Sequence, residues 1–195
     1  MSREDYIGVD EAGRGPWAGP VCFAAVSMHG LPWDLLGRLK DSKSLTARRR
    51  DLIFYELQKS GARIGLHWSS PRQIDSLGLT RCSVIGMSAA VSQIMSGNER
   101  IIVDGNYNYL GEVFESSEAV IKADAKYVAV SAASIVAKVM RDRYMRRCAA
   151  RFQDFGFDAH VGYGTSKHKD ALLKFGPTIM HRQSFRPVAE ASGVN

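Results

Sequence analysis

Residues 6–28 have the sequence YIGVDEAGRGPWAGPVCFAAVSM, and this stretch decides the fold. Residues 6–9 form a short apolar run, and residues 20–28 are small and β-branched apolar residues, so each run predicts a strand. Gly and Pro interrupt the segment between them, residues 13–20, which is typical of a loop. The stretch therefore predicts a chain that starts with two strands arranged like a hairpin.

Strands and helices follow in a mixed order. Helical spacing of apolar residues covers 47–59, and Ser70-Pro71 and Gly78-Leu79-Thr80 are helix-start signals before the apolar face of residues 80–95. Three further strands are predicted at residues 62–68, 101–103 and 119–122, and a long helix reaches about residue 151. The order predicts an α/β protein whose sheet has about five strands, followed by a small helical C-terminal piece that includes residues 167–175.

Composition narrows the class of protein. The chain has 195 residues, 45% of them hydrophobic, which suits one domain with a buried core. No apolar run approaches the ~18 to 20 residues of a membrane span, and residues 1–10 lack the apolar stretch of a signal peptide. Three cysteines without CxxC spacing and five histidines without an HExxH pattern predict neither disulfides nor a zinc site. We expect a soluble, cytoplasmic protein.

Positive charge is concentrated late in the chain. The net charge is +6, and residues 1–137 hold 15 Lys and Arg against 15 Asp and Glu, whereas residues 138–195 hold 11 against 5. A localised basic surface attracts nucleic acid by releasing counterions. A solvated basic helix would carry the same charge, so this feature alone does not identify a nucleic-acid-binding surface.

Four carboxylates lie at strand ends or in the loops that follow: Asp10, Glu11, Asp104 and Asp124. If these strands are neighbours, the carboxylates converge and repel one another unless they share a cation. Ligands made only of oxygen suit Mg²⁺ or Mn²⁺ and not zinc. Two such ions ~3.5 to 4 Å apart can hydrolyse a phosphodiester. An isolated Asp in such a place is usually an ordinary loop residue, so the interpretation needs a motif.

The loop Gly13-Arg14-Gly15 supplies part of that motif, because glycines let backbone N–H groups approach a phosphate or a sugar. The spacing GxGxxxG, followed by a strand, does not fit a dinucleotide-binding loop, and no Walker loop occurs.

Residues 10–21, DEAGRGPWAGPV, resemble the opening signature of the ribonuclease HII family. Further segments resemble other signatures of that family in the same order: DSK at 41–43, VDGN at 103–106, KADAK at 122–126, SAASIVAKV at 131–139 with RDR at 141–143, GYGT at 162–165 followed by His168, and residues 181–187. Ala123 departs from the pattern, since the family usually has Gly before its fourth carboxylate. An added Cβ there would shift Asp124 if the position needs a positive φ.

The resemblance implies a ribonuclease H-like mixed sheet in residues 1–150, with residues 151–195 as a helical subdomain that closes over the substrate. It also implies a set of site residues. Asp10, Glu11, Asp104 and Asp124 would be the catalytic metal ligands, Asp142 an accessory ligand, Gly13, Arg14 and Gly15 the cradle of the ribose, Tyr163 the sensor of its 2′-OH, and Ser42 and Lys43 phosphate contacts. Asp142 could instead be the i,i+4 ion-pair partner of Lys138 or Arg146.

The activity implied is an endonuclease for RNA–DNA hybrids that also cuts on the 5′ side of single ribonucleotides in duplex DNA. It would use Mg²⁺ or Mn²⁺, leave 3′-hydroxyl and 5′-phosphate ends, and act as a monomer. Ribonuclease HIII is a nearby alternative, but it carries an N-terminal substrate-binding extension before the first carboxylate. A non-catalytic nucleic-acid-binding module is a second alternative, and loss of a carboxylate would favour it.

Overall fold

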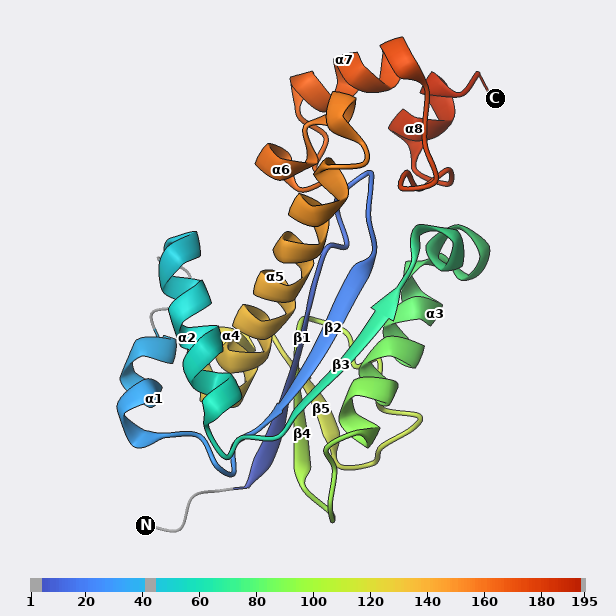
Figure 1. Cartoon of the computed structure of the whole chain (residues 1–195). Coiled ribbons are helices and arrows are strands. Elements are labelled where there is room, and N and C mark those ends of the chain that lie inside the picture. The colour runs from blue at the N-terminus through green and yellow to red at the C-terminus, as the bar shows by residue number, and fades with distance from the viewer. Residues whose placement is uncertain (1–4, 41–44, 194–195) are drawn as a thin grey trace.

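A mixed five-stranded sheet forms the centre of the computed structural model, which describes residues 5–40 and 45–193 (Figure 1). The strands are β1 (Tyr6–Ala12), β2 (Val21–Ser27), β3 (Ile64–Ser69), β4 (Arg100–Asp104) and β5 (Ser117–Val120). Their order is β3-β2-β1-β4-β5, with β1–β2 and β2–β3 antiparallel and β1–β4 and β4–β5 parallel. The predicted mixed sheet and its hairpin start are confirmed.

The helices agree with the predicted spacing where that spacing was clear. They are α1 (Trp33–Lys40), α2 (Ala47–Lys59), α3 (Pro71–Ser92), α4 (Ala123–Lys126), α5 (Val128–Ala149), α6 (Phe157–His160), α7 (Ser166–Phe175) and α8 (Arg186–Ala191). Both predicted start signals operate in α3. A capping box between Ser70 and Gln73 starts the helix at Pro71, and Gly78, with φ 76°, interrupts it before the second segment. The sequence did not predict α1, α4, α6 or α8 as separate helices.

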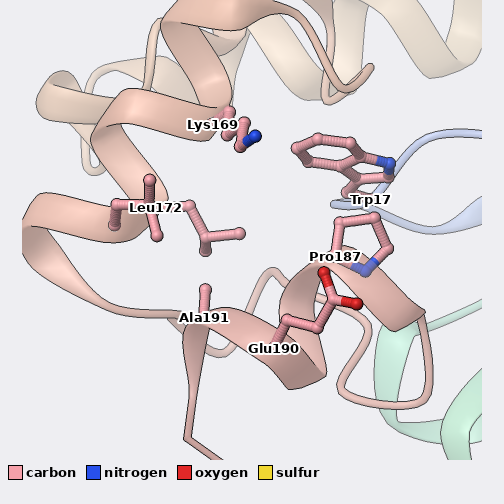
Figure 2. Close-up of a pocket in the computed structure, with 7 residues that line it drawn as sticks. Trp17, Lys169, Leu172, Pro187, Glu190 and Ala191 are labelled. Atoms are coloured by element: carbon pink, nitrogen blue, oxygen red, sulfur yellow. The ribbon is translucent and has the colours of Figure 1, made fainter.

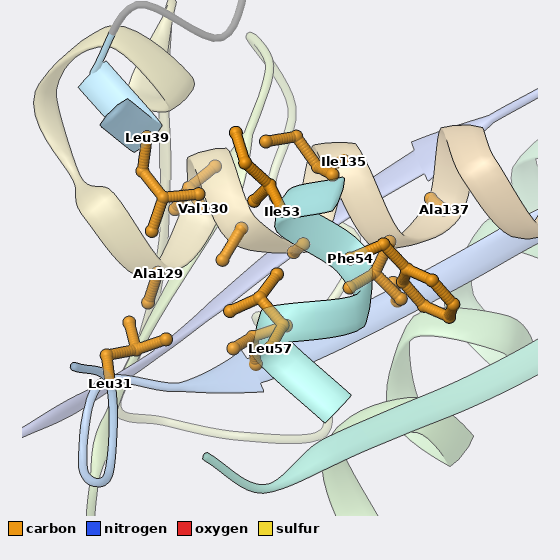
Figure 3. Close-up of a cluster of buried hydrophobic side chains, with 14 of the residues drawn as sticks. Leu31, Leu39, Ile53, Phe54, Leu57, Ala129, Val130, Ile135 and Ala137 are labelled. Atoms are coloured by element: carbon orange, nitrogen blue, oxygen red, sulfur yellow. The ribbon is translucent and has the colours of Figure 1, made fainter. Parts of the chain in front are cut away.

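Helices cover both faces of the sheet. On one face, α1, α2 and α5 bury a cluster that includes Leu39, Leu57 and Ile135 (Figure 3). On the other face, α3 and the segment after β4 bury a second cluster around Phe23 and Met87. Contact is close, because a Cβ at Gly8 of β1 would lie 2.2 Å from the backbone of α5. The central strands are therefore buried on both sides, and their positions are fixed.

The C-terminal helices pack beyond the end of the sheet, next to the loop between β1 and β2 (Figure 1). They share a third apolar cluster that includes Phe157, Leu172 and Val188. Ala18 of that loop and Met145 of α5 belong to the same cluster. The division at residue 150 stays a prediction, but this cluster explains how the C-terminal helices are held against the rest. Within the described residues, no helix is long and apolar enough to cross a membrane.

Candidate active site

The parallel pairing of β1 and β4 brings three carboxylates to one edge of the sheet. The pairing ends at Val9 and Val103, so Asp10 and Asp104 are the next residues of two adjacent strands that run in the same direction. Glu11 follows Asp10 and is half-buried. The charges of Asp10 and Glu11 both interact with that of Asp104. Asp10, Glu11 and Asp104 therefore lie at one edge of the sheet.

Asp124 reaches the same edge through the short helix α4. The backbone N–H of Ala123 donates to Asp104 Oδ1 at 2.7 Å, and Asp124, the next residue, is buried with 8% of its surface exposed. Ala123 is itself buried and does not have a positive φ; the residue in the left-handed region is Lys122, with φ 57°. Because Ala123 does not need a positive φ, its Cβ gives no reason for Asp124 to shift.

The carboxylates destabilise one another in the absence of a cation. Burial, then the charges of Glu11 and Asp104, raise the pKa of Asp10 well above its usual range, against hydrogen bonds from Ser134 and from the Glu11 N–H at 2.7 Å. Burial and Asp104 also raise the pKa of Glu11, while Arg14, whose Nε lies 3.7 Å from Glu11 Oε1, lowers it. Such a set of oxygen ligands suits a hard divalent cation.

The metal-ligand assignment stays a prediction at the level of single residues. Among residues 5–40 and 45–193, no three His, Cys, Asp or Glu side chains are arranged closely enough to hold a metal ion. Asp142 is buried and forms an ion pair with Lys138, with Nζ 2.9 Å from Oδ1. The i,i+4 role left open for Asp142 is therefore present, and its role as an accessory ligand stays a prediction.

A cavity of ≈ 300 Å³ lies beside Glu11, between segments that are far apart in the sequence. Glu11, the segment 12–15, Ser134, Lys138 and Tyr163 line it. Tyr163 faces the glycine-rich loop, because a Cβ at Gly15 would lie 4.0 Å from Tyr163 Cε1. The predicted cradle and the predicted 2′-OH sensor thus lie opposite each other beside Glu11. Sequence analysis did not identify Ser134 or Lys138 as site residues.

The side chain of Arg14 is held by the protein. Its guanidinium donates to Ser83 Oγ at 2.6 Å and to the Tyr109 hydroxyl at 3.1 Å, in addition to the ion pair with Glu11. These contacts tie the glycine-rich loop to α3 and to the segment after β4. Arg14 therefore fixes one wall of the cavity, and its own contact with a phosphate stays a prediction.

Arg182 is fully buried and holds the same loop from the other side. It donates to the carbonyl of Gly13 at 2.5 Å, of Arg14 at 2.8 Å and of Gly19 at 2.8 Å. Burial lowers its pKa to about 9. In the sequence, Arg182 is one of the 11 basic residues of the segment 138–195. The structure shows that it binds backbone carbonyls and is not part of the surface charge.

Arg141 connects the two walls of the cavity. Its buried guanidinium donates to the carbonyls of Pro20 at 2.9 Å and Ala18 at 3.1 Å, and to that of Val161 at 3.0 Å, two residues before Tyr163. Gly13 must lack a side chain here, because its φ is 102° and a Cβ would lie 2.0 Å from Arg141 Nε. Neither Arg141 nor Arg182 contributes to the exposed basic surface.

Ser42 and Lys43 lie outside the described residues. A second cavity, of ≈ 260 Å³, lies between Trp17, Leu172 and Pro187 in the C-terminal part of the molecule (Figure 2). None of the four strand-end carboxylates lines it. Of these four carboxylates, Glu11 lines the first cavity.

The chain is similar to known proteins over most of its length. The family model described as "Ribonuclease HII" matches residues 7–188. A ribonuclease HII of Shewanella piezotolerans is 40% identical over 186 residues, which cover 95% of this chain and 90% of the relative. The crystal structure of ribonuclease H2 from Pyrococcus horikoshii is similar with a TM-score of 0.81 and 26% identity, covering 97% of both chains. Bst-RNase HIII in complex with Mn²⁺ shares the fold, with a TM-score of 0.74 and 19% identity over 97% of this chain and 70% of that one.

Proposed function

The chain belongs to the ribonuclease HII family and is a ribonuclease H, and we propose that it cuts the RNA strand of RNA–DNA hybrids and also cuts 5′ of single ribonucleotides in duplex DNA. The proposed products are 3′-hydroxyl and 5′-phosphate ends. The observation that carries the proposal is the convergence of Asp10, Glu11 and Asp104 beside the cavity that Tyr163 and the glycine-rich loop line.

Asp10, Glu11, Asp104 and Asp124 would hold the metal, which we propose to be two Mg²⁺ or Mn²⁺ ions during the reaction. When bound, such ions activate a water for in-line attack and stabilise the leaving 3′ oxygen. The donor set supports this choice, because it consists of carboxylates whose burial and mutual repulsion disfavour ionisation without a cation. The Mn²⁺ bound by Bst-RNase HIII, which shares the fold, is consistent with it.

The residues of this chain would position the substrate and the ligands. Ser134 hydrogen-bonds to Asp10 and so orients that carboxylate. The ribose at the cut would lie between the Gly13–Gly15 backbone and the half-exposed ring of Tyr163. Contacts to its 2′-OH at this place would distinguish ribose from deoxyribose. Ser42 and Lys43 remain the proposed phosphate contacts, and Asp142 the proposed accessory ligand.

Three labelled duplexes test this function: a long RNA–DNA hybrid, a DNA duplex with one ribonucleotide, and the same duplex made only of DNA. Each is incubated with Mg²⁺, with Mn²⁺ or with a chelator. We expect cleavage of the first two only, dependent on metal, with the single cut on the 5′ side of the ribonucleotide. Cleavage of the all-DNA duplex, or full activity in the chelator, would contradict the proposal.

A non-catalytic nucleic-acid-binding module is disfavoured because all four carboxylates are present. A monomer, a cytoplasmic location and a C-terminal subdomain that closes over the duplex belong to the same proposal. Light scattering of the protein alone and with the duplex checks the first of these.

A further inference from the structure

Three histidines pack together next to the backbone of Tyr163, and none of them lines the cavity. His168 and His181 are buried, and the ring of His160 stacks on that of His168 at 4.6 Å between centroids. Phe155 and Phe157 surround the rings of His168 and His181. None of these histidines lies among the strand-end carboxylates, so the proposed chemistry gives them no role.

Hydrogen bonds link two of the rings in a chain that ends on Tyr163. The Thr178 N–H donates to His181 Nδ1 at 2.9 Å, His181 Nε2 lies 3.0 Å from His168 Nε2, and His168 Nδ1 lies 2.9 Å from the Tyr163 carbonyl oxygen. A carbonyl only accepts and a backbone N–H only donates. We therefore assign the proton of His168 to Nδ1 and that of His181 to Nε2, and every step of the chain then has one donor and one acceptor.

The third ring has its proton assigned in the same way. His160 Nε2 lies 2.7 Å from the Phe155 carbonyl oxygen, so it donates, and His160 Nδ1 accepts from the Gly162 N–H at 3.2 Å. Each acceptor nitrogen of the three rings already faces a donor, so a further proton would bring two N–H groups together. In agreement, burial lowers the pKa of all three histidines, that of His181 to about 4.

The turn that carries Tyr163 has a backbone that needs such support. Val161 has φ 45°, which is rare for a β-branched residue and persists only where the surroundings enforce it. Around it, Arg141 binds the Val161 carbonyl and the Trp17 N–H binds the Gly162 carbonyl at 2.9 Å. The Tyr163 carbonyl is held by His168, and by the Thr165 N–H at 2.9 Å.

We propose that the Thr178–His181–His168 chain of hydrogen bonds is a positioning device that sets the place of Tyr163 opposite Gly15. His168 and His181 are thus positioning residues: they touch neither the metal ligands nor the cavity, and they act through the Tyr163 carbonyl. The inference rests on the proposed function insofar as Tyr163 reads the ribose. It adds that the single-ribonucleotide activity depends on a buried chain of neutral imidazoles.

A matched pair of substitutions at His168 separates positioning from packing. The amide of Asn reaches the place of Nδ1, and that of Gln the place of Nε2. His168→Asn therefore keeps a donor for the Tyr163 carbonyl and loses the bond to His181. His168→Gln keeps the bond to His181 and leaves the Tyr163 carbonyl with the Thr165 N–H but without its side-chain donor. The measured quantity is the ratio of kcat/KM on the single-ribonucleotide duplex to kcat/KM on the long hybrid.

We expect His168→Gln to lower this ratio by about threefold. This is somewhat less than the effect of losing a typical hydrogen bond to the substrate, because the ring of Tyr163 remains. His168→Asn should keep the ratio of the wild type. In a Tyr163→Ala background neither substitution should change the ratio further, because both act through the same residue. Equal effects of Asn and Gln, or an effect that persists without Tyr163, would overturn the proposal.

A second measurement keeps the test independent of the proposed function. The protein is labelled with 3-fluorotyrosine, and the ¹⁹F resonance of Tyr163 is identified by its loss in Tyr163→Phe. We expect His168→Gln to shift this resonance and His168→Asn to leave it in place. His181→Asn keeps an acceptor for the Thr178 N–H but removes the donor that faces His168 Nε2. Unlike the amide of His168→Asn, the His168 ring can then carry its proton on Nε2 and cease to donate to the Tyr163 carbonyl, so His181→Asn should also shift the resonance. It is the second variant if His168→Gln does not fold.

Failure of the proposed role of Tyr163 and failure of the positioning chain give different results. If Tyr163→Ala itself leaves the kinetic ratio unchanged, the proposed role of Tyr163 fails, and the ¹⁹F shift alone decides the positioning chain. If no variant of the chain moves the Tyr163 resonance, the positioning chain is refuted whatever the kinetics show.

Discussion

The guanidinium of Arg182 donates to the Gly13 carbonyl at 2.5 Å, across 169 residues of sequence. This contact joins the C-terminal part of the chain to the glycine-rich loop that follows the first two carboxylates. One wall of the candidate active site is therefore held by a residue near the end of the chain, and the loop geometry depends on the C-terminal helices being packed.

Arg182→Lys should reduce both stability and activity. A lysine ammonium on its flexible stem cannot bond the carbonyls of Gly13, Arg14 and Gly19 in the fixed geometry of a guanidinium. Leaving a buried carbonyl without a donor costs about 1–3 kcal/mol. Thermal unfolding and kcat/KM on the hybrid check this, with Arg186→Lys as the control, because Arg186 is exposed and forms an ion pair with Glu190. Equal melting temperatures for the two variants would contradict the anchoring role.

Asp10→Asn should lower cleavage more than about a hundredfold, the loss typical of one contact that stabilises a transition state, while the protein stays folded. Without metal, the variant should melt at a higher temperature than the wild type at pH 7, because the buried charge of Asp10 is repelled by Glu11 and Asp104. Added Mg²⁺ should stabilise the wild type and have less effect on the variant. Asp51→Asn, which removes an exposed partner of Arg143, is the control. Near wild-type turnover of Asp10→Asn would refute the assignment.

Tyr163→Ala should lose more activity on the single-ribonucleotide duplex than on the long hybrid. One ribose offers one 2′-OH to recognise, whereas a hybrid offers many registers, so the ratio of the two kcat/KM values should fall about five- to tenfold. Tyr55→Ala serves as the control, since Tyr55 is similarly exposed on α2, away from the cavity. A lowered melting temperature with an unchanged ratio would mean that Tyr163 only packs the C-terminal part.

Stability should fall as the pH drops from about 7 to 4. Burial and the neighbouring His168 lower the pKa of His181 from the ordinary 6.5 to about 4, so in this window the unfolded chain binds more protons than the folded protein. The stabilisation is complete above 6.5 and is lost as the pH falls toward 4. His168 and His160, which faces Lys167 and Asp158, shift in the same direction. Asp10 and Glu11 have raised pKa values and act in the opposite direction.

The difference between the wild type and His181→Asn isolates this histidine. Because Asn does not titrate, the stability advantage of the wild type should shrink between pH 7 and pH 4. Melting curves at several pH values in that range measure it. If the two proteins lose stability in parallel, His181 does not carry the effect.

Several parts of the fold follow from the sequence, because they depend on local physical chemistry. Apolar runs, and in one segment the alternation of apolar and polar residues, predicted the strands of the sheet. The helical spacing of apolar residues predicted α2 at residues 47–59. Asp10 and Asp104 were expected to converge if their strands are neighbours, and the parallel pairing of β1 and β4 makes them so. In contrast, α4 has only four residues and its amphipathic pattern is too short to detect, so the way in which Asp124 reaches that edge was not predicted.

Residue type and spacing along the backbone were enough to predict the carboxylates, the glycine-rich loop and the succession of strands and the longer helices along the chain. The tertiary structure was needed to show that Arg141 and Arg182 are buried anchors and that Tyr163 faces Gly15. It was also needed to show that His168 and His181 form a hydrogen-bonded chain that ends on the Tyr163 carbonyl. A long polar side chain has the same pattern in the sequence whether it is solvated or buried. Its role depends on which distant carbonyls or rings come within hydrogen-bonding distance, and packing between segments far apart in the chain determines that.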